Sequence, residues 1–350
     1  MFVCARCGTE LTAPVSRVAL PVRARQTYGH EMLPALMESG TYAVDPEPRG
    51  GPWRPWDDVG EEAAAAGGVF APVYSLPSGA RGAVVIAPGD TRGTVLHPDR
   101  CDGYCLGVTR GDVPNLTCED CGLPVANRVD DCSYWQAVWL EPTAVRRVPG
   151  PATPITDWQT LVEERERRST PPVEQPGFWS PQWEAAAGVA LAHLLAASAG
   201  AHVALPGGLG TDMFGRALDA LLPPGRPART VALAGPGLPA SGADIALVPV
   251  HPQTGEAWQP TGSPATVPLP ADVWLGLAFP EDHSRLPVTG GLPRGVERDD
   301  PLPLHPRWMF RPDRRLFLYT LARLPAVRQP WLRGIYDQVG DCFTFPFRLF

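Results

Sequence analysis

The distribution of cysteines constrains the fold of this 350-residue chain more than any other feature of its sequence. Seven of the eight cysteines precede residue 133, and six of these form three close-spaced pairs, whereas Cys342 stands alone near the end. A lone cysteine usually behaves as a small buried hydrophobic residue, but close-spaced pairs are typical of metal ligands. The N-terminus lacks an apolar signal-peptide core, so we expect a cytoplasmic protein, in which disulfides are rare. The cysteines therefore predict metal binding.

Two of the pairs share one frame, C-x2-C-G, with an apolar residue four positions after the second cysteine. The two segments are Cys4–Gly8 and Cys118–Gly122, and their second cysteines are Cys7 and Cys121. The glycine relaxes the backbone where a turn around a metal must curl. This frame resembles the knuckles of zinc ribbons and rubredoxins, and the resemblance stops at these short segments. It implies that thiolates three positions apart bind one cation.

The spacing leaves the pairing of the cysteines open. In one scheme the two glycine-bearing knuckles, Cys4/Cys7 and Cys118/Cys121, share a metal. In a more local scheme, Cys101 and Cys105 combine with the second knuckle. Cys132 and His97 are left over in both schemes and can complete a second site with the unused pair. We favour the first scheme.

Zinc is the predicted metal because it is the commoner occupant of such sites, and iron is the second choice because rubredoxin knuckles offer the same ligands. Four sulfurs fill a tetrahedral site and leave no open position, which predicts a structural role. A thiol redox role is disfavoured, because a redox C-x2-C opens a helix, whereas Gly122–Pro124 follows the second knuckle. Asp130 and Asp131, beside Cys132, can orient a ligand or cap a turn.

Length and pattern predict two domains of mixed α+β and α/β class. We expect a β-rich, zinc-bearing domain over residues 1–150, a helix with a proline-rich linker over 151–181, and an α/β layered domain over 182–350. In the first domain we expect strands at 82–87 and 134–140, a weaker strand at 17–25, and an irregular insertion over 45–68.

Around the linker and beyond it, helical and strand patterns alternate. Thr156 to Gln159 reads as a capping box that opens a helix over 157–168. We then expect helices at 182–199, 212–222 and 313–324, and strands at 201–205, 230–234, 245–250 and 273–279. The uncharged stretch Ala185–Leu205 is better explained as a buried helix and strand than as a membrane span.

The features that could carry catalysis are weak. All 30 basic residues are arginine, which excludes Schiff-base, phosphate-loop and kinase chemistry that needs a lysine. The turn Gly207–Asp212 lies between a strand and a helix, where phosphates bind, but its glycine spacing departs from the dinucleotide pattern. His193 is expected in a helix core, and His30, His251, His283 and His305 in or near loops.

The last 46 residues, from His305, are rich in arginine and aromatic residues, a combination suited to single-stranded nucleic acid. The simpler interpretation is that the aromatics fill the second core, and that Phe343–Phe347 forms a strand. The net charge of −7 disfavours both nucleic acid and anionic membranes as partners.

These observations predict a cytoplasmic zinc-binding protein with a structural metal site and a protein-binding or scaffolding role. Two alternatives remain open: an enzyme with a small-molecule site near Gly207–Asp212, and a protein that binds single-stranded nucleic acid through its C-terminal segment. The sequence leaves the catalytic residues and the partner unidentified.

Overall fold

The computed structural model describes residues 1–103, 105, 107–109, 111, 113–151, 153–174, 177–225, 228–280, 286–287, 297–298 and 306–341. The chain forms two compact units. The first contains Met1–Asp58 and Tyr74–Ile155, and the second contains Val59–Val73 and Thr156–Phe350. Residues 59–73, which the sequence placed in the first domain, thus belong to the second unit, as does most of the expected linker.

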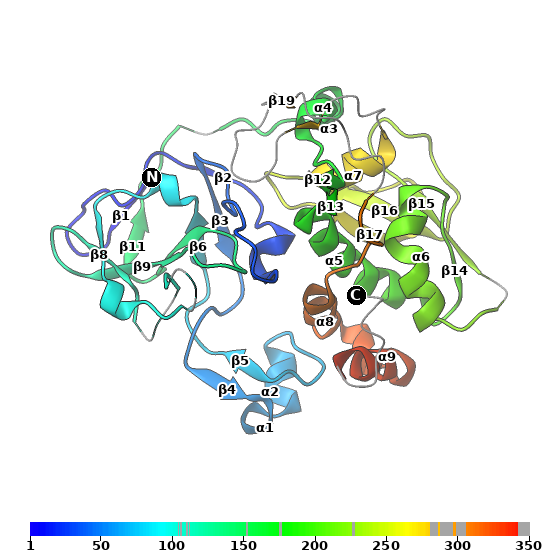
Figure 1. Cartoon of the computed structure of the whole chain (residues 1–350), viewed down its shortest axis with the longest axis horizontal. Coiled ribbons are helices and arrows are strands. Elements are labelled where there is room, and N and C mark those ends of the chain that lie inside the picture. Colours follow the sequence, from blue (N-terminus) through cyan, green and yellow to red (C-terminus); the bar gives the residue numbers. More distant parts are fainter. Residues whose placement is uncertain are drawn as a thin grey trace. The chain divides into compact units, whose positions relative to one another are not determined.

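The first unit is built on a seven-stranded mixed sheet (Figure 1). Its strands, in spatial order, are β2 (Ser16–Arg17), β3 (Thr41–Asp45), β6 (Ala83–Ile86), β10 (Ala137–Leu140), β9 (Pro124–Val129), β8 (Leu116–Cys118) and β7 (Thr94–Leu96). β2 pairs with β3 in parallel, and the other neighbours are antiparallel. The expected strands at 82–87 and 134–140 are confirmed as β6 and β10.

Both faces of this sheet are covered, because the central strands are buried along their whole length. Val84 and Ile86 pack in one core together with Cys4 and Cys118, while Val85 packs on the opposite face. This division follows the two-residue period of a strand. The opposite core is closed by Leu33, Leu36, Met37 and Trp135. The cysteine knuckles are therefore anchored in the core of one face only.

Smaller elements complete the first unit. β1 (Phe2–Cys4) pairs with β11 (Val145–Arg147), and β4 (Trp53–Pro55) pairs with β5 (Ser75–Pro77). Helix α1 (Trp56–Val59) and helix α2 (Glu61–Ala66), the latter in the second unit, replace part of the irregular insertion expected over 45–68. The strand expected over 17–25 is wrong beyond Arg17. A 3-10 helix, Val22–Arg25, follows Pro21, which breaks the extended run; further single turns lie at Pro88–Asp90 and Pro98–Arg100.

The second unit contains a parallel four-stranded sheet in the order β14 (Val203–Ala204), β15 (Arg229–Leu233), β16 (Ile245–Val250), β17 (Ala265–Pro270). Helix α5 (Pro181–Ser198) contacts β16 and β17, and α6 (Leu209–Leu221) connects β14 to β15. No helix in the described part of the chain combines the length and apolar character that crossing a membrane requires.

The expected strand over 273–279 is wrong, because these residues form helix α7 (Ala271–Ala278). Trp274 is fully buried and its indole N–H donates to the carbonyl of Leu247 in β16 (3.1 Å). A short, wholly apolar run has no periodicity that distinguishes a buried helix from a buried strand. The strand that precedes α7 is β17, which carries Pro268 and Pro270; prolines are unusual in a strand, but an outer strand of the described sheet tolerates them.

The remaining elements of the second unit are α3 (Trp158–Glu163), α4 (Arg165–Arg168), β12 (Val173–Glu174), β13 (Phe178–Trp179), β18 (Leu286–Pro287), β19 (Glu297–Arg298), α8 (Arg314–Leu321), a 3-10 helix (Pro325–Arg328) and α9 (Pro330–Gly340). The cap of α3 is Asp157 rather than Thr156: its carboxylate accepts the N–H of Thr160 (2.8 Å). Cys342, His283, His305 and the expected strand Phe343–Phe347 lie outside the described residues.

Candidate metal centre

The two cysteine knuckles have the same backbone structure. In the first, the N–H of Gly8 donates to the carbonyl of Cys4 (3.0 Å), and the N–H of Cys4 donates to the carbonyl of Thr9 (2.8 Å). In the second, Gly122 donates to Cys118 (2.9 Å), and Cys118 donates to Leu123 at the corresponding position (2.9 Å). Identical spacing has therefore produced identical turns in two distant parts of the chain.

The glycine of each knuckle has a left-handed backbone, with φ of 87° at Gly8 and 67° at Gly122. A side chain in this conformation brings Cβ against the following carbonyl oxygen at a cost of about 1–2 kcal/mol. The apolar residue four positions after the second cysteine also has a clear role, because Leu11 and Val125 are both fully buried beneath the knuckles. Each shared residue of the frame is accounted for by backbone geometry or by core packing.

The knuckles are held together by the strands and loops beside them. Cys4 ends β1 and Cys118 ends β8, and both side chains are buried in the same core. Ala5 donates its N–H to the carbonyl of Ala144 (3.0 Å), and Glu119 donates to Gly93 (3.0 Å). Thr9 reaches across from the first knuckle and donates its hydroxyl to the carboxylate of Asp120 in the second (2.5 Å).

The four sulfurs converge on one point. The Sγ atoms of Cys4 and Cys121 are 3.6 Å apart, those of Cys7 and Cys118 are 3.4 Å apart, and all four lie within 4.8 Å of one another. A tetrahedron of sulfurs about 2.3 Å from a central zinc has edges of about 3.8 Å. The cluster thus has the size and composition that a tetrahedral metal ion requires, and it is the grouping that the sequence favoured.

The pKa values of two cysteines in this cluster are shifted in opposite directions. Hydrogen bonding with the side chain and the backbone of Thr9 lowers the pKa of Cys7 to about 6. At Cys121 the backbone N–H of Leu123 lowers the pKa, but desolvation and the adjacent thiols outweigh it and raise the pKa to about 12. Four sulfurs at these distances cannot all carry charge without a cation between them. A divalent metal ion supplies that compensation and favours the thiolate of every ligand.

The more local pairing is not assembled. The thiol of Cys101 lies 3.6 Å from the carbonyl oxygen of His97 and 3.6 Å from the amide nitrogen of the buried Asn115. The His97 ring is 2.9 Å from the hydroxyl of Thr117. Neither Cys101 nor His97 joins a metal-binding group among the described residues.

Cys105 and Cys132, in contrast, do share a group, and its third member is His30. In the favoured scheme, the sequence predicts that Cys132 and His97 complete a second site with the unused pair, Cys101 and Cys105. The structure keeps Cys105 beside Cys132, but a histidine from a loop near the N-terminus takes the place of His97 and Cys101. His30 has no spacing relationship to any cysteine, so no local pattern could have identified it.

Comparisons with known proteins add no identity to this chain. No family model, curated protein or solved structure matches it. Function must therefore be argued from the geometry of its own residues.

The catalytic candidates of the second unit have structural explanations. The ring of His251 is buried; its Nε2 donates to the carbonyl of Thr156 (2.8 Å), and its Nδ1 accepts the N–H of Gln253 (3.2 Å). Burial lowers the pKa of His193 in α5. At Gly207–Asp212 the helix α6 begins after Gly208 with no side-chain cap, and Thr211 donates its hydroxyl to the carbonyl of Pro206 (2.9 Å).

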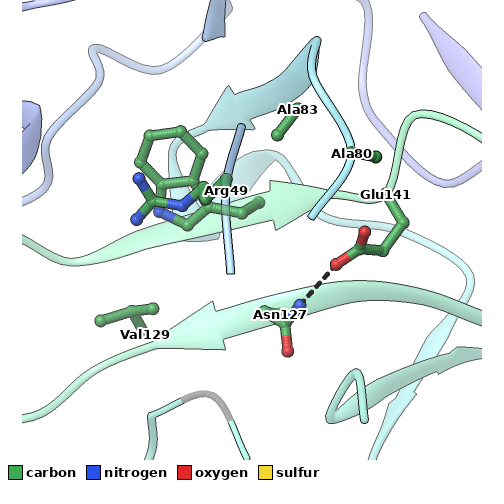
Figure 2. Close-up of a pocket in the computed structure, with 7 residues that line it drawn as sticks. Arg49, Ala80, Ala83, Asn127, Val129 and Glu141 are labelled. Atoms are coloured by element: carbon green, nitrogen blue, oxygen red, sulfur yellow. Dashed lines mark hydrogen bonds between the residues drawn. The ribbon is translucent and has the colours of Figure 1, made fainter. Parts of the chain in front are cut away.

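Two of the hollows in the described part of the structure bear on this question. One, in the second unit, has a volume of about 210 Å³ and lies between the loops that follow β15 and β16. The other, in the first unit, measures about 40 Å³ and is lined by Arg49, Asn127 and Glu141, among others (Figure 2). Asn127 donates its amide to Glu141 (2.8 Å) while its own oxygen is buried without a partner. A space of this size suits water rather than an organic substrate.

Several arginines of the C-terminal segment are engaged within the protein. Arg314 donates to the carbonyls of Val339 and Gly340 at the end of α9, and Arg323 stacks 3.4 Å from the ring of Tyr319. Arg333 pairs with Asp337 one turn later. Phe317 is fully buried. In residues 306–341 these contacts fit the simpler interpretation, in which the segment completes the second core.

Proposed function

We propose that the protein binds a structural zinc ion through Cys4, Cys7, Cys118 and Cys121, and that it serves as a protein-binding or scaffolding protein. The observation that carries the metal assignment is the convergence of four thiols from two matching knuckles within 4.8 Å. The exclusively sulfur donor set fits zinc and leaves no open position for a substrate. The site is therefore assigned to folding rather than to catalysis.

A metal at this position would tie the beginning of the chain to the centre of the first unit. β1 carries Cys4 and forms a separate two-stranded sheet with β11. β8 carries Cys118 and lies within the seven-stranded sheet. Structural zinc sites contribute about 10–16 kcal/mol of apparent binding free energy in small zinc peptides at pH 7. Even a fraction of this would fix β1 and its knuckle in place.

Metal analysis of the purified full chain tests the assignment. We expect zinc that remains bound without added metal and that is lost from the four-cysteine site in Cys7→Ser and in Cys118→Ser. Cys101→Ser is the matched control, because its thiol belongs to neither group of ligands. A red protein with visible absorption would show that the bound metal is iron instead of zinc. Less than half a metal ion per chain, in protein purified without chelator, would remove the proposal.

The binding role rests on exposed aromatic side chains of the paired strands β4 and β5. Trp53 in β4 is 61% exposed, and Tyr74, immediately before β5, is 98% exposed. Exposed aromatics are enriched among the residues that dominate protein interfaces. In the described residues the catalytic candidates show no assembled set of nucleophile and base, which favours binding over catalysis.

Affinity capture with the full chain tests this role. We expect the parent to capture a partner protein. The variant Ile155→Ala, which changes an exposed apolar side chain in the same unit, should capture the same partner and serves as the control. The double variant Trp53→Ala/Tyr74→Ala is expected to lose this partner while keeping its metal content. Equal capture by the double variant and the parent would contradict the role assigned to these strands.

A further inference from the structure

Three loops of the first unit bring a second set of metal-binding side chains together. The Nδ1 atom of His30 lies 3.5 Å from the Sγ of Cys132 and 3.8 Å from the Sγ of Cys105. All three ligand atoms lie within 4.8 Å of one another. None of these residues belongs to the four-cysteine cluster, so the group is a separate one.

These distances are those of one face of a coordination tetrahedron. Zinc binds sulfur at about 2.3 Å and imidazole nitrogen at about 2.0 Å, which places adjacent nitrogen and sulfur ligands about 3.6 Å apart. The two observed nitrogen–sulfur distances bracket this value. These contacts are also within hydrogen-bonding range of sulfur, but a metal ion would engage all three ligand atoms at once.

A buried carboxylate fixes the backbone positions of the two cysteines. Asp131 is 5% exposed, and its Oδ1 accepts the N–H of Cys132 (2.9 Å) and that of Cys105 (3.2 Å). Its other oxygen lies against Gly103, where a Cβ would be only 2.8 Å away. The chain approaches this carboxylate so closely that only glycine fits. Asp131 thus positions two backbone segments that are far apart in the sequence.

The loop that carries His30 is fastened to the segment after Cys132. Tyr28 donates its N–H to the carbonyl of Ser133 (2.9 Å), and Ser133 donates its own N–H to the carbonyl of Glu31 (3.0 Å). The hydroxyl of Ser133 donates to Gly29. Ser133 has a φ of 74°, which a non-glycine residue adopts only where its surroundings require it. Both flanks of His30 are therefore bonded to the residue that follows Cys132.

We propose that His30, Cys105 and Cys132 bind a second zinc ion, with the fourth position of the tetrahedron taken by solvent. Two thiolates and one imidazole are a donor set that zinc accepts when it keeps an exchangeable ligand. His30 and Cys105 are both exposed, so water can reach the metal. Asp131 is the positioning residue of this site, because it bonds to the backbone of both cysteines rather than to the metal.

The proposed site differs from the four-cysteine site in two measurable ways. Its loss should leave the zinc at Cys4, Cys7, Cys118 and Cys121 in place, because the two groups share no residue. Its exchangeable position should bind a small anion, whereas a site filled by four sulfurs should not. Failure of one assignment therefore leaves the other intact.

The decisive experiment counts zinc per chain in the full-length protein purified with reductant. We expect two zinc ions in the parent and in Cys101→Ser, and one in Cys132→Ser and in His30→Gln. The His30 variant changes an exposed side chain, so it keeps the test valid if the cysteine variant folds poorly. Zinc is then replaced by cobalt in the parent and in His30→Gln. We expect azide or cyanide to shift only those absorption bands of the parent that the variant lacks.

Three results would overturn the zinc site itself. The first is a parent protein that holds a single zinc, retained in His30→Gln. The second is loss of the second zinc in Cys101→Ser, which would restore the local pairing of Cys101 with Cys105. The third is a Cys105–Cys132 disulfide in protein kept under reductant, shown by thiol counting and peptide mass, because it would make the pair a redox element instead. A cobalt spectrum unaffected by either anion would refute the solvent-bound fourth position.

Discussion

The thiols of Cys4 and Cys121 lie 3.6 Å apart although 117 positions separate them in the chain. Each belongs to a knuckle whose own geometry is local, but their meeting depends on β1 and β8 being placed in the same core. Closing a chain segment of this length costs conformational entropy. A metal ion bound between the knuckles would oppose that cost.

Removal of a ligand from the four-cysteine site should therefore destabilise the first unit. We expect Cys118→Ser to lower its midpoint of thermal unfolding by about 10 °C or more, with the loss of one zinc per chain. A chelator added to the parent should produce the same shift. Cys101→Ser should unfold within a few degrees of the parent. Unchanged unfolding of Cys118→Ser, measured by calorimetry, would show that the cluster does not support the fold.

The glycines of the knuckles give a second prediction. Gly8→Ala and Gly122→Ala should each lower the free energy of unfolding by about 1–2 kcal/mol, because both positions have positive φ. Space is not the cause, since a Cβ added at either position would meet no atom within 4 Å. Gly150→Ala has the same open surroundings without a positive φ and should be nearly neutral. Urea unfolding of the three variants makes the comparison, and equal stabilities would contradict it.

Asp131 provides a test of positioning at the second group. Asp131→Ala removes the acceptor shared by Cys105 and Cys132. Loss of such outer partners typically weakens metal binding about 10–100-fold, so competition with a chromophoric chelator should show one site weakened by this factor. The four-cysteine site should keep its affinity. Asp131→Asn retains an acceptor oxygen and should recover part of the loss, whereas two unchanged affinities in the alanine variant would refute the positioning role.

The lowered pKa of His193 predicts that the stability of the second unit falls in acid. Burial lowers its pKa in the folded state below the ordinary value of 6.5. Below pH 6.5 the unfolded chain therefore binds more protons than the folded one, and stability falls as the pH drops towards the folded-state pKa. Between about pH 7 and pH 5, urea midpoints should fall less in His193→Gln than in the parent. His202→Gln serves as the control, and parallel curves for the parent and His193→Gln would exclude the effect.

Two helical glycines should respond to alanine in opposite directions. At Gly188 in α5, a Cβ would lie within van der Waals overlap of the carbonyl oxygen of Asp313, just before α8. Gly188→Ala must push this backbone away and should destabilise the second unit by about 1–3 kcal/mol. Gly334 in α9 has open space, so Gly334→Ala should stabilise by about 0.5–1 kcal/mol. Thermal unfolding of both variants checks the signs, and a stabilised Gly188→Ala would contradict the packing.

Local sequence patterns predicted the turns, helices and strands that depend on residues close together in the sequence. The C-x2-C-G frames predicted both knuckles, and the apolar runs predicted α5, β15 and β16 close to their observed bounds. The errors came where local signals conflict with packing. α7 has an apolar run that suits either a strand or a helix, and only its contact with β16 decides between them. β17 carries two prolines, which argue against a strand unless the strand is at an edge, so its sequence gives no clear strand signal.

The sequence by itself determined the two turns that can each present a pair of thiols, because glycine and cysteine at fixed spacing specify a backbone curl. It also determined that lysine chemistry is excluded, because the chain contains none. Only the tertiary structure decided which pairs meet. Cys101 and Cys105 are four positions apart yet contact different partners, while His30 joins Cys132 from a loop 102 positions away. Contacts of that kind are set by strand register and core packing, which no local spacing encodes.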